Sequence, residues 1–145
     1  MTPVTKLLLL VIGFFLFFTV RSMFAQTAKS MGGRVSPPEA AARVKAGSAI
    51  LIDVREPDEW NSGVAAPAYL LPLSDLKGSR KKWAHVLEDA KDKQILLYCR
   101  SGNRSGQAAA LLAKAGYSVA NVGGFGDWQK AGLPTRKPDE PAGND

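Results

Sequence analysis

Short apolar runs alternate along the chain with helix-forming segments, and this alternation constrains the fold more than any other feature. The runs at 49–54 (AILIDV) and 94–98 (QILLY) are apolar almost throughout, as strands are when both faces of a parallel sheet are covered. We therefore expect an α/β fold, a small parallel sheet flanked by helices on both faces. Further strands are expected at 68–71 and 117–122, helical segments at 36–47, 74–76, 82–90, 105–114 and 127–131, and a short turn or helix at 56–60.

The first 25 residues have the features of an export signal. Lys6 precedes a 14-residue apolar or neutral run at 7–20, which Arg21 closes. As a helix the run would extend about 21 Å, short of the roughly 30 Å hydrocarbon core of a bilayer. Cleavage after Ala25 or Ala28 would lack the usual pattern of small residues. Two alternatives stay open for 1–25, a signal peptide or a retained anchor attached to the membrane through 7–20, and both predict a periplasmic or otherwise exported protein.

Downstream of the leader we expect a flexible tether at 26–35, one compact domain at 36–135 and a disordered tail at 136–145. The net charge of +6 has one dense basic block, at 80–82, which is typical of a solvated helix face and predicts no nucleic-acid partner. One cysteine and one histidine exclude an internal disulfide and argue against a protein-bound metal. His85 lies far in sequence from the cysteine and is not expected to be catalytic.

Polar residues follow the predicted strands at 49–54 and 94–98, at the points where these strands end. The first set includes Asp53 and Arg55, and the second begins at Cys99. In an open parallel sheet, ligands bind beyond the carboxyl ends of the strands. We expect Asp53 and Arg55 to form an ion pair that either braces the cysteine loop or is purely structural.

The cysteine loop carries the strongest chemical signal. A thiol between a buried strand and a helix faces backbone amides and the positive end of the helix dipole, so its pKa should fall. Arg100 and Arg104 add positive charge, Gly102 permits a tight curl, and Ser101, Asn103 and Ser105 can donate hydrogen bonds to an anion. The alternative is an ordinary buried cysteine at a strand end, which the surrounding residues disfavour.

A nucleophilic sulfur in an anion cradle suits two chemistries. Phosphotyrosine-type phosphatases place five residues between cysteine and arginine, around a tetrahedral phosphate. Four residues separate Cys99 from Arg104, so the bowl is tighter and suits a cysteine that carries one extra sulfur. A relative of phosphatases or arsenate reductases stays an alternative.

Three motifs in order resemble a single-domain rhodanese of the thiosulfate sulfurtransferase family, over about 36–135. They are the segment 53–57 (DVREP) with Trp60, the loop 99–104 (CRSGNR), and 123–125 (GGF) with Trp128, Gly132 and Pro134. With its leader, the chain resembles the small exported sulfurtransferases of bacteria. One departure is the segment 63–68 (GVAAPA), which lacks the histidine and second glycine of the family's usual GHIPGA and puts the geometry of that loop in doubt.

The resemblance implies a two-step sulfur transfer without a cofactor. Cys99 would take the outer sulfur of thiosulfate or a similar donor as a persulfide and pass it to cyanide or a thiol. Arg100 and Arg104 would hold the donor's sulfonate oxygens, while the loop amides stabilise the persulfide. The alternative is a non-catalytic rhodanese-like module that binds a partner in the cell envelope.

Overall fold

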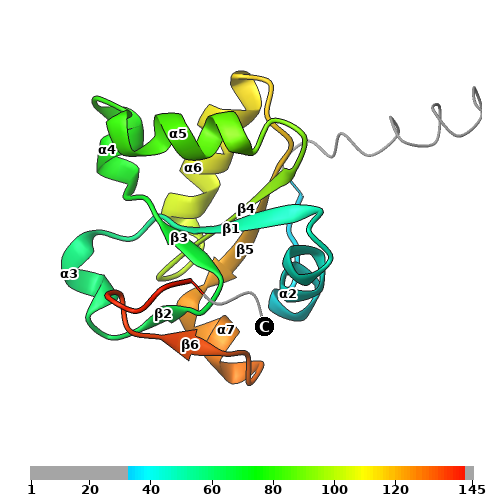
Figure 1. Ribbon diagram of the computed structural model, residues 1–145, viewed down its shortest axis with the longest axis vertical. Coiled ribbons are helices and arrows are strands. Elements are labelled where there is room, and N and C mark those ends of the chain that lie inside the picture. The colour runs from blue at the N-terminus through cyan, green and yellow to red at the C-terminus, as the bar shows by residue number, and fades with distance from the viewer. Residues whose placement is uncertain (1–32, 143–145) are drawn as a thin grey trace, which may run out of the picture.

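A computed structural model describes residues 33–142 of the chain. Its centre is a four-stranded parallel sheet in the order β3-β1-β4-β5, formed by β1 (Ala49–Asp53), β3 (Ala68–Leu70), β4 (Gln94–Cys99) and β5 (Val119–Gly124) (Figure 1). The two central strands, β1 and β4, correspond to the apolar runs predicted as buried strands, and nearly all their residues are buried. The predicted parallel sheet is confirmed.

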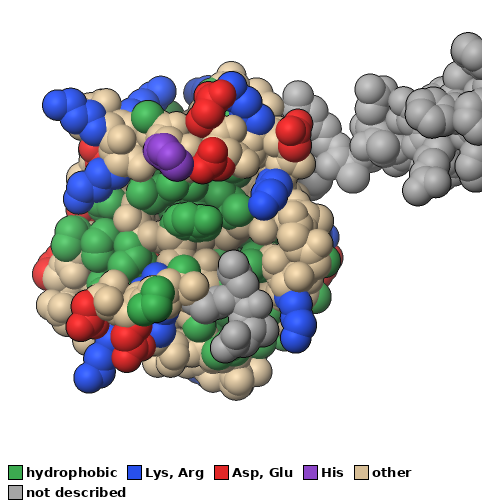
Figure 2. Space-filling view, in the orientation of Figure 1, with side chains coloured by type: hydrophobic (Ala, Val, Ile, Leu, Met, Phe, Trp, Pro, Cys, Tyr) green, Lys and Arg blue, Asp and Glu red, His purple; other side chains and the backbone are tan. Residues whose placement is uncertain are grey.

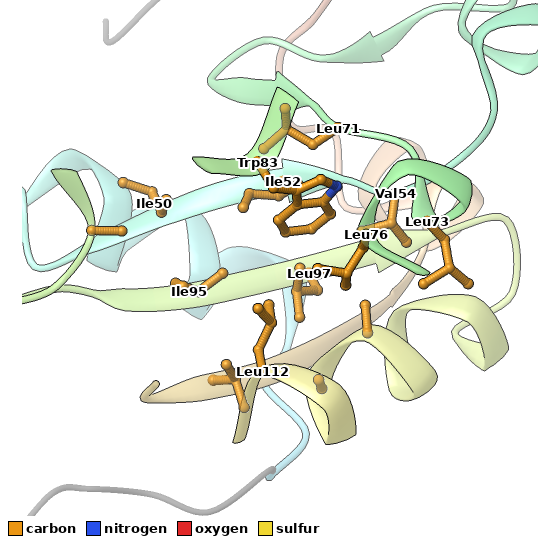
Figure 3. Close-up of a cluster of buried hydrophobic side chains, with 14 of the residues drawn as sticks. Ile50, Ile52, Val54, Leu71, Leu73, Leu76, Trp83, Ile95, Leu97 and Leu112 are labelled. Carbon is orange, nitrogen blue, oxygen red and sulfur yellow. The ribbon is translucent and has the colours of Figure 1, made fainter. Parts of the chain in front are cut away.

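Helices cover both faces of the sheet, as predicted. One face packs against α4 (Leu73–Lys77), α5 (Lys81–Asp89) and α6 (Asn103–Lys114), and the other against α2 (Pro37–Lys45) and α7 (Phe125–Lys130) (Figure 1). Figure 3 shows the first core, where Ile52 and Leu97 from the central strands meet Trp83 of α5 and Leu112 of α6. Burial of these apolar side chains fixes the sheet between its two helical layers.

A second, two-stranded sheet was not predicted. In it β2 (Val64–Ala65) pairs antiparallel with β6 (Thr135–Arg136). The Arg136 guanidinium donates from Nε to the carbonyl of Ala66 and from Nη2 to that of Ala68, at 2.9 and 2.7 Å. The segment whose sequence departs from the family pattern is therefore held by this small sheet and by Arg136.

The structure differs from the predicted domain limits at both ends. Residues 34 and 35, predicted as tether, join the edge of β5: Arg34 forms a parallel bridge to Asn121, and Val35 is buried. Arg136, predicted to begin a disordered tail, is the second residue of β6. The leader at 1–25 and the tether before residue 33 lie outside the described residues.

The three tryptophans lie in the core, whereas His85 lies at the surface. Trp60, Trp83 and Trp128 are buried, and the indole N–H of Trp83 donates to the carbonyl of Pro72. The His85 side chain is 87% exposed on α5, paired with Asp89 (purple in Figure 2). No helix between residues 33 and 142 is long and apolar enough to cross a membrane.

Candidate active site

Cys99 is the last residue of β4, at the carboxyl edge of the sheet, and only 1% of it is exposed. The chain then turns through 100–102 into α6. Gly102 precedes the first turn of α6 with φ 93°, a left-handed conformation that glycine adopts without strain. This turn aims the backbone N–H of Gly102 at the Cys99 Sγ, 3.0 Å away.

The sulfur of Cys99 lies among hydrogen-bond donors. Besides the Gly102 amide, the Ser105 hydroxyl lies 3.5 Å from Sγ. Burial alone would raise the pKa of the Cys99 thiol, but hydrogen bonds from the Ser105 hydroxyl and from the amides of Ser105, Ser101 and Gly102 outweigh it. The pKa of Cys99 is therefore lowered, and the N-terminus of the 12-residue α6 also favours the thiolate.

The two loop arginines differ in their surroundings. Arg100 is exposed and forms no ion pair with any residue in the described part of the chain. Arg104 is half-buried and forms a two-point ion pair with Glu59 of α3 (Pro57–Trp60), with Nη1–Oε2 and Nη2–Oε1 distances of 2.5 and 2.6 Å. Arg104, predicted to hold the donor's sulfonate, is thus already engaged by a carboxylate.

Asn121 of β5 holds the loop from the other side. Its Nδ2 donates to the Gly102 carbonyl at 2.8 Å, and its Oδ1 accepts from the Gly123 amide at 3.0 Å and from the Ser105 hydroxyl at 2.8 Å. Because Oδ1 can only accept, the single proton of the Ser105 hydroxyl points to Asn121 when this bond forms, and Asn121 competes for it with the more distant sulfur. Asn121 therefore positions both side-chain and backbone donors that face Cys99.

A close backbone contact completes the support of the loop. A Cβ added at Gly124, the last residue of β5, would lie 2.6 Å from the carbonyl oxygen of Arg100. Only glycine permits this approach, so the Arg100 carbonyl lies directly against the end of β5. This contact explains on steric grounds why the second residue of the glycine pair at 123–124, part of the family motif, is glycine.

The geometry agrees with the comparison with known proteins. Residues 36–131 match the Rhodanese-like domain family. The chain belongs to this family.

Several relatives carry sulfurtransferase names. The chain is 37% identical over 92 residues to a protein named Sulfurtransferase from Allochromatium vinosum, covering 62% of this chain and 80% of that protein. It is 35% identical over 77 residues to Thiosulfate sulfurtransferase PspE from Escherichia coli, covering 52% of this chain and 70% of PspE. Two other curated relatives extend well beyond the match, since the chain spans 47% and 61% of their lengths.

Among solved structures, the chain resembles a rhodanese-related protein from Thermoplasma volcanium. The TM-score is 0.60 at 30% identity, over 72% of this chain and 97% of that chain. The rhodanese-like fold, a parallel sheet between helical layers with a cysteine loop at its carboxyl edge, is therefore found in this chain.

The predicted supporting pair, Asp53 and Arg55, forms as expected, but away from the sulfur. Arg55 Nη2 lies 2.7 Å from Asp53 Oδ2, and both side chains are buried. Among residues 33–142, no hydrogen bond or ion pair joins either of them to the loop at 99–104. The connection is indirect: Arg55 Nη1 donates to the backbone carbonyl of Glu59 at 3.2 Å, and the Glu59 carboxylate binds Arg104.

The remaining predicted loop residues lie on the outer rim. Ser101 and Asn103 are exposed, and Asn103 Oδ1 accepts a hydrogen bond from Gln107 at 2.8 Å. Two residues that the sequence did not single out, Glu59 and Asn121, contact the loop directly. Asn121 is a polar residue inside an otherwise apolar strand, which is a usable signal, whereas nothing local pairs Glu59 with an arginine 45 positions away.

The described residues contain no group of three or more histidine, cysteine, aspartate or glutamate side chains suited to hold a metal ion.

Proposed function

We propose that this chain is a sulfurtransferase that moves a sulfane sulfur from thiosulfate, or a similar donor, to cyanide or a thiol through a Cys99 persulfide. The proposal rests on the environment of the Cys99 sulfur, which accepts a hydrogen bond from the Gly102 amide at 3.0 Å. The pKa of the Cys99 thiol is lowered. Membership of the rhodanese-like family and the sulfurtransferase names of two relatives support it.

The first step is an attack of the Cys99 thiolate on the outer sulfur of the donor. With thiosulfate, the sulfur–sulfur bond breaks and sulfite leaves with the bonding electron pair, so that Cys99 carries a persulfide anion. The amides of Ser101, Gly102 and Ser105 act on the Cys99 sulfur, and we expect amides of this loop to stabilise the negative charge of the persulfide as well. Such preorganised donors are most effective where water is excluded, as around the buried Cys99.

The second step regenerates the enzyme. A nucleophilic acceptor attacks the outer persulfide sulfur, and the Cys99 thiolate is the leaving group. The same donors that lower the pKa of Cys99 make it a good leaving group. Because the chain has a single cysteine, no second thiol of the chain can convert the persulfide into an internal disulfide.

A mass measurement tests this function directly. The purified chain is incubated with thiosulfate and its intact mass is recorded, with Cys99→Ser as the matched control. We expect a gain of one sulfur atom in the wild-type chain and none in the variant, and thiocyanate formation when cyanide follows. If Cys99 gains no sulfur, the proposal fails, and a non-catalytic binding module becomes the better description.

We further propose that the protein is exported, with 1–25 as a signal peptide or an anchor through 7–20; the apolar run behind Lys6 supports this. Intact mass of the protein recovered from fractionated cells distinguishes the two forms. A soluble periplasmic species without the leader indicates cleavage, and a full-length species in the membrane fraction indicates an anchor. Recovery from the cytosol at full length would contradict export.

A further inference from the structure

The guanidinium of Arg104 is fully engaged on the side that faces α3. Its two terminal nitrogens bind the two oxygens of Glu59 in a fork, at 2.5 and 2.6 Å. The two side chains are 28% and 25% exposed, so the pair lies at the boundary between the core and solvent. Two-point pairs of this geometry are among the stronger charged hydrogen bonds in proteins.

The carboxylate of Glu59 is fixed independently of Arg104. The backbone amide of Glu56 donates to Oε2 at 3.0 Å, which completes a capping box at the start of α3. The Glu59 carbonyl is held by Arg55, which is itself buried against Asp53. The hydrogen bond from Arg104 lowers the pKa of Glu59 to about 2, so the carboxylate is charged at neutral pH.

This arrangement gives the two arginines of the cysteine loop different surroundings. Arg100 is exposed and unpaired within the described part of the chain, whereas the charge of Arg104 is balanced by Glu59. A donor anion that reaches Cys99 can bind the loop amides. To gain from Arg104 as well, it must compete with a carboxylate that is already in place.

We infer that Glu59 is a specificity-determining residue, which disfavours doubly charged sulfur donors relative to singly charged ones by holding Arg104. The inference rests on the proposed sulfurtransferase function and concerns which donor charge the site prefers. A second negative charge on the donor meets the Glu59 carboxylate instead of a free guanidinium. Repulsion between like charges at close range weakens binding of the donor, and the bonds that form and break in the reaction stay the same.

Two small donors differ mainly in that second charge. Thiosulfate is a dianion, and methanethiosulfonate is a monoanion in which a methyl group replaces one sulfonate oxygen. In both cases the Cys99 thiolate forms a bond to the outer sulfur and the sulfur–sulfur bond breaks. The electron pair leaves on sulfite or on methanesulfinate, and the persulfide on Cys99 is the same. The ratio of kcat/KM for thiosulfate to that for methanethiosulfonate therefore measures the discrimination by charge.

The test replaces Glu59 with glutamine in the full chain. Glu59→Gln keeps the shape and an oxygen for the Glu56 amide, but it removes the charge that balances Arg104. We expect the ratio to rise about tenfold, equivalent to about 1.4 kcal/mol. The change should appear in KM for thiosulfate with kcat nearly unchanged, since it alters binding of the donor. An unchanged ratio, or an equal change for both donors, would overturn the inference.

Two further variants locate the effect. In Arg104→Gln, the unpaired Glu59 carboxylate should repel the dianion more strongly, so the ratio falls; in Glu59→Gln/Arg104→Gln it should return close to that of the wild type. Asp58→Asn is the matched control, because it removes a charge from the same helix at an exposed residue whose side chain forms no ion pair with any residue between 33 and 142. It should change the ratio by less than about twofold, because charges without direct contact are screened by solvent and salt.

The assay separates this inference from the proposed function. If neither donor adds a sulfur to Cys99, the sulfurtransferase function fails. If both donors load Cys99 and the ratio is the same in wild type and Glu59→Gln, only the role of Glu59 fails. Should Glu59→Gln not fold, Glu59→Asp carries the test: a carboxylate shorter by one methylene loses the two-point fork, and the ratio should rise in the same direction by a smaller factor.

Discussion

Two arginine–carboxylate pairs adjoin the short helix α3, one just before it in sequence and one formed by its own Glu59, and they differ in burial. Asp53 and Arg55 are 0% and 4% exposed, whereas Glu59 and Arg104 are 25% and 28% exposed. Both pairs have two-point geometry. The same chemistry is thus used once inside the fold and once at the rim of the cysteine loop.

The difference lies in what else surrounds each arginine. Arg55 also donates to the backbone carbonyls of Glu59 and Gly63 and lies 4.4 Å from the ring centre of Phe125. Burial alone would lower the pKa of Arg55, but the hydrogen bond and charge of Asp53 outweigh it and the pKa is raised. The buried pair fixes the backbone of Glu59 through the hydrogen bond from Arg55. The partly exposed pair leaves the Glu59 carboxylate and the Arg104 guanidinium within reach of solvent.

The largest effect should come from breaking the buried pair. Asp53→Ala leaves the Arg55 cation buried without its counter-charge, and removal of one partner of such a pair costs about 3–5 kcal/mol. Urea unfolding followed by tryptophan fluorescence measures the loss of free energy of unfolding. The double variant Asp53→Ala/Arg55→Met should recover part of it, because an apolar replacement of both partners is often nearly neutral. Equal losses for Asp53→Ala and Glu59→Ala would remove the distinction between the two pairs.

A neutral hydrogen bond beside the buried pair gives a smaller effect. The hydroxyl of Tyr98 accepts the backbone amide of Ala65 at 3.0 Å, and both residues are fully buried. Tyr98→Phe leaves that amide unsatisfied, which should cost about 1–3 kcal/mol. Tyr69→Phe is the control, since the same change at a residue that is 46% exposed on β3 should stay within about 0.5 kcal/mol. A loss at Tyr98 no greater than at Tyr69 would show that this bond does not hold β2 against the main sheet.

The main sheet and the cysteine loop could be predicted because their signals are local. The apolar runs of β1 and β4 indicate buried strands by themselves, and the polar loop that follows β4 indicates a site at the carboxyl edge. The bounds differ by one or two residues. For example, α6 begins at Asn103 instead of 105, because Gly102 makes the left-handed turn that starts the helix early.

What the sequence did not predict depends on pairs that are distant along the chain. The strands β2 and β6 have two residues each and are too short to show a period. Glu59 and Arg104 are 45 positions apart, and each has closer partners of opposite charge in the sequence. Only the parallel sheet, which brings the ends of β1 and β4 side by side, places α3 against the cysteine loop. The different surroundings of the two loop arginines therefore had to come from the structure.

The smallest effect, and the one that best separates the two pairs, is the contribution of Glu59 to stability as a function of pH. Its pKa is lowered from 4.5 to about 2, chiefly by the hydrogen bond from Arg104. A carboxyl group with a lowered pKa in the folded state stabilises the fold above its unfolded pKa, and this contribution is lost as the pH falls through the folded pKa. At neutral pH, Glu59→Gln should cost no more than about 1 kcal/mol in free energy of unfolding, because the pair is partly exposed.

Urea unfolding at successive pH values measures this contribution. The free energy of unfolding of the wild type should exceed that of Glu59→Gln at neutral pH, and the excess should be lost between pH 4.5 and about 2. High salt should reduce the excess throughout. A constant difference down to pH 2 would mean that the charge of Glu59 contributes nothing to the folded state, and that the exposed pair serves only to hold Arg104.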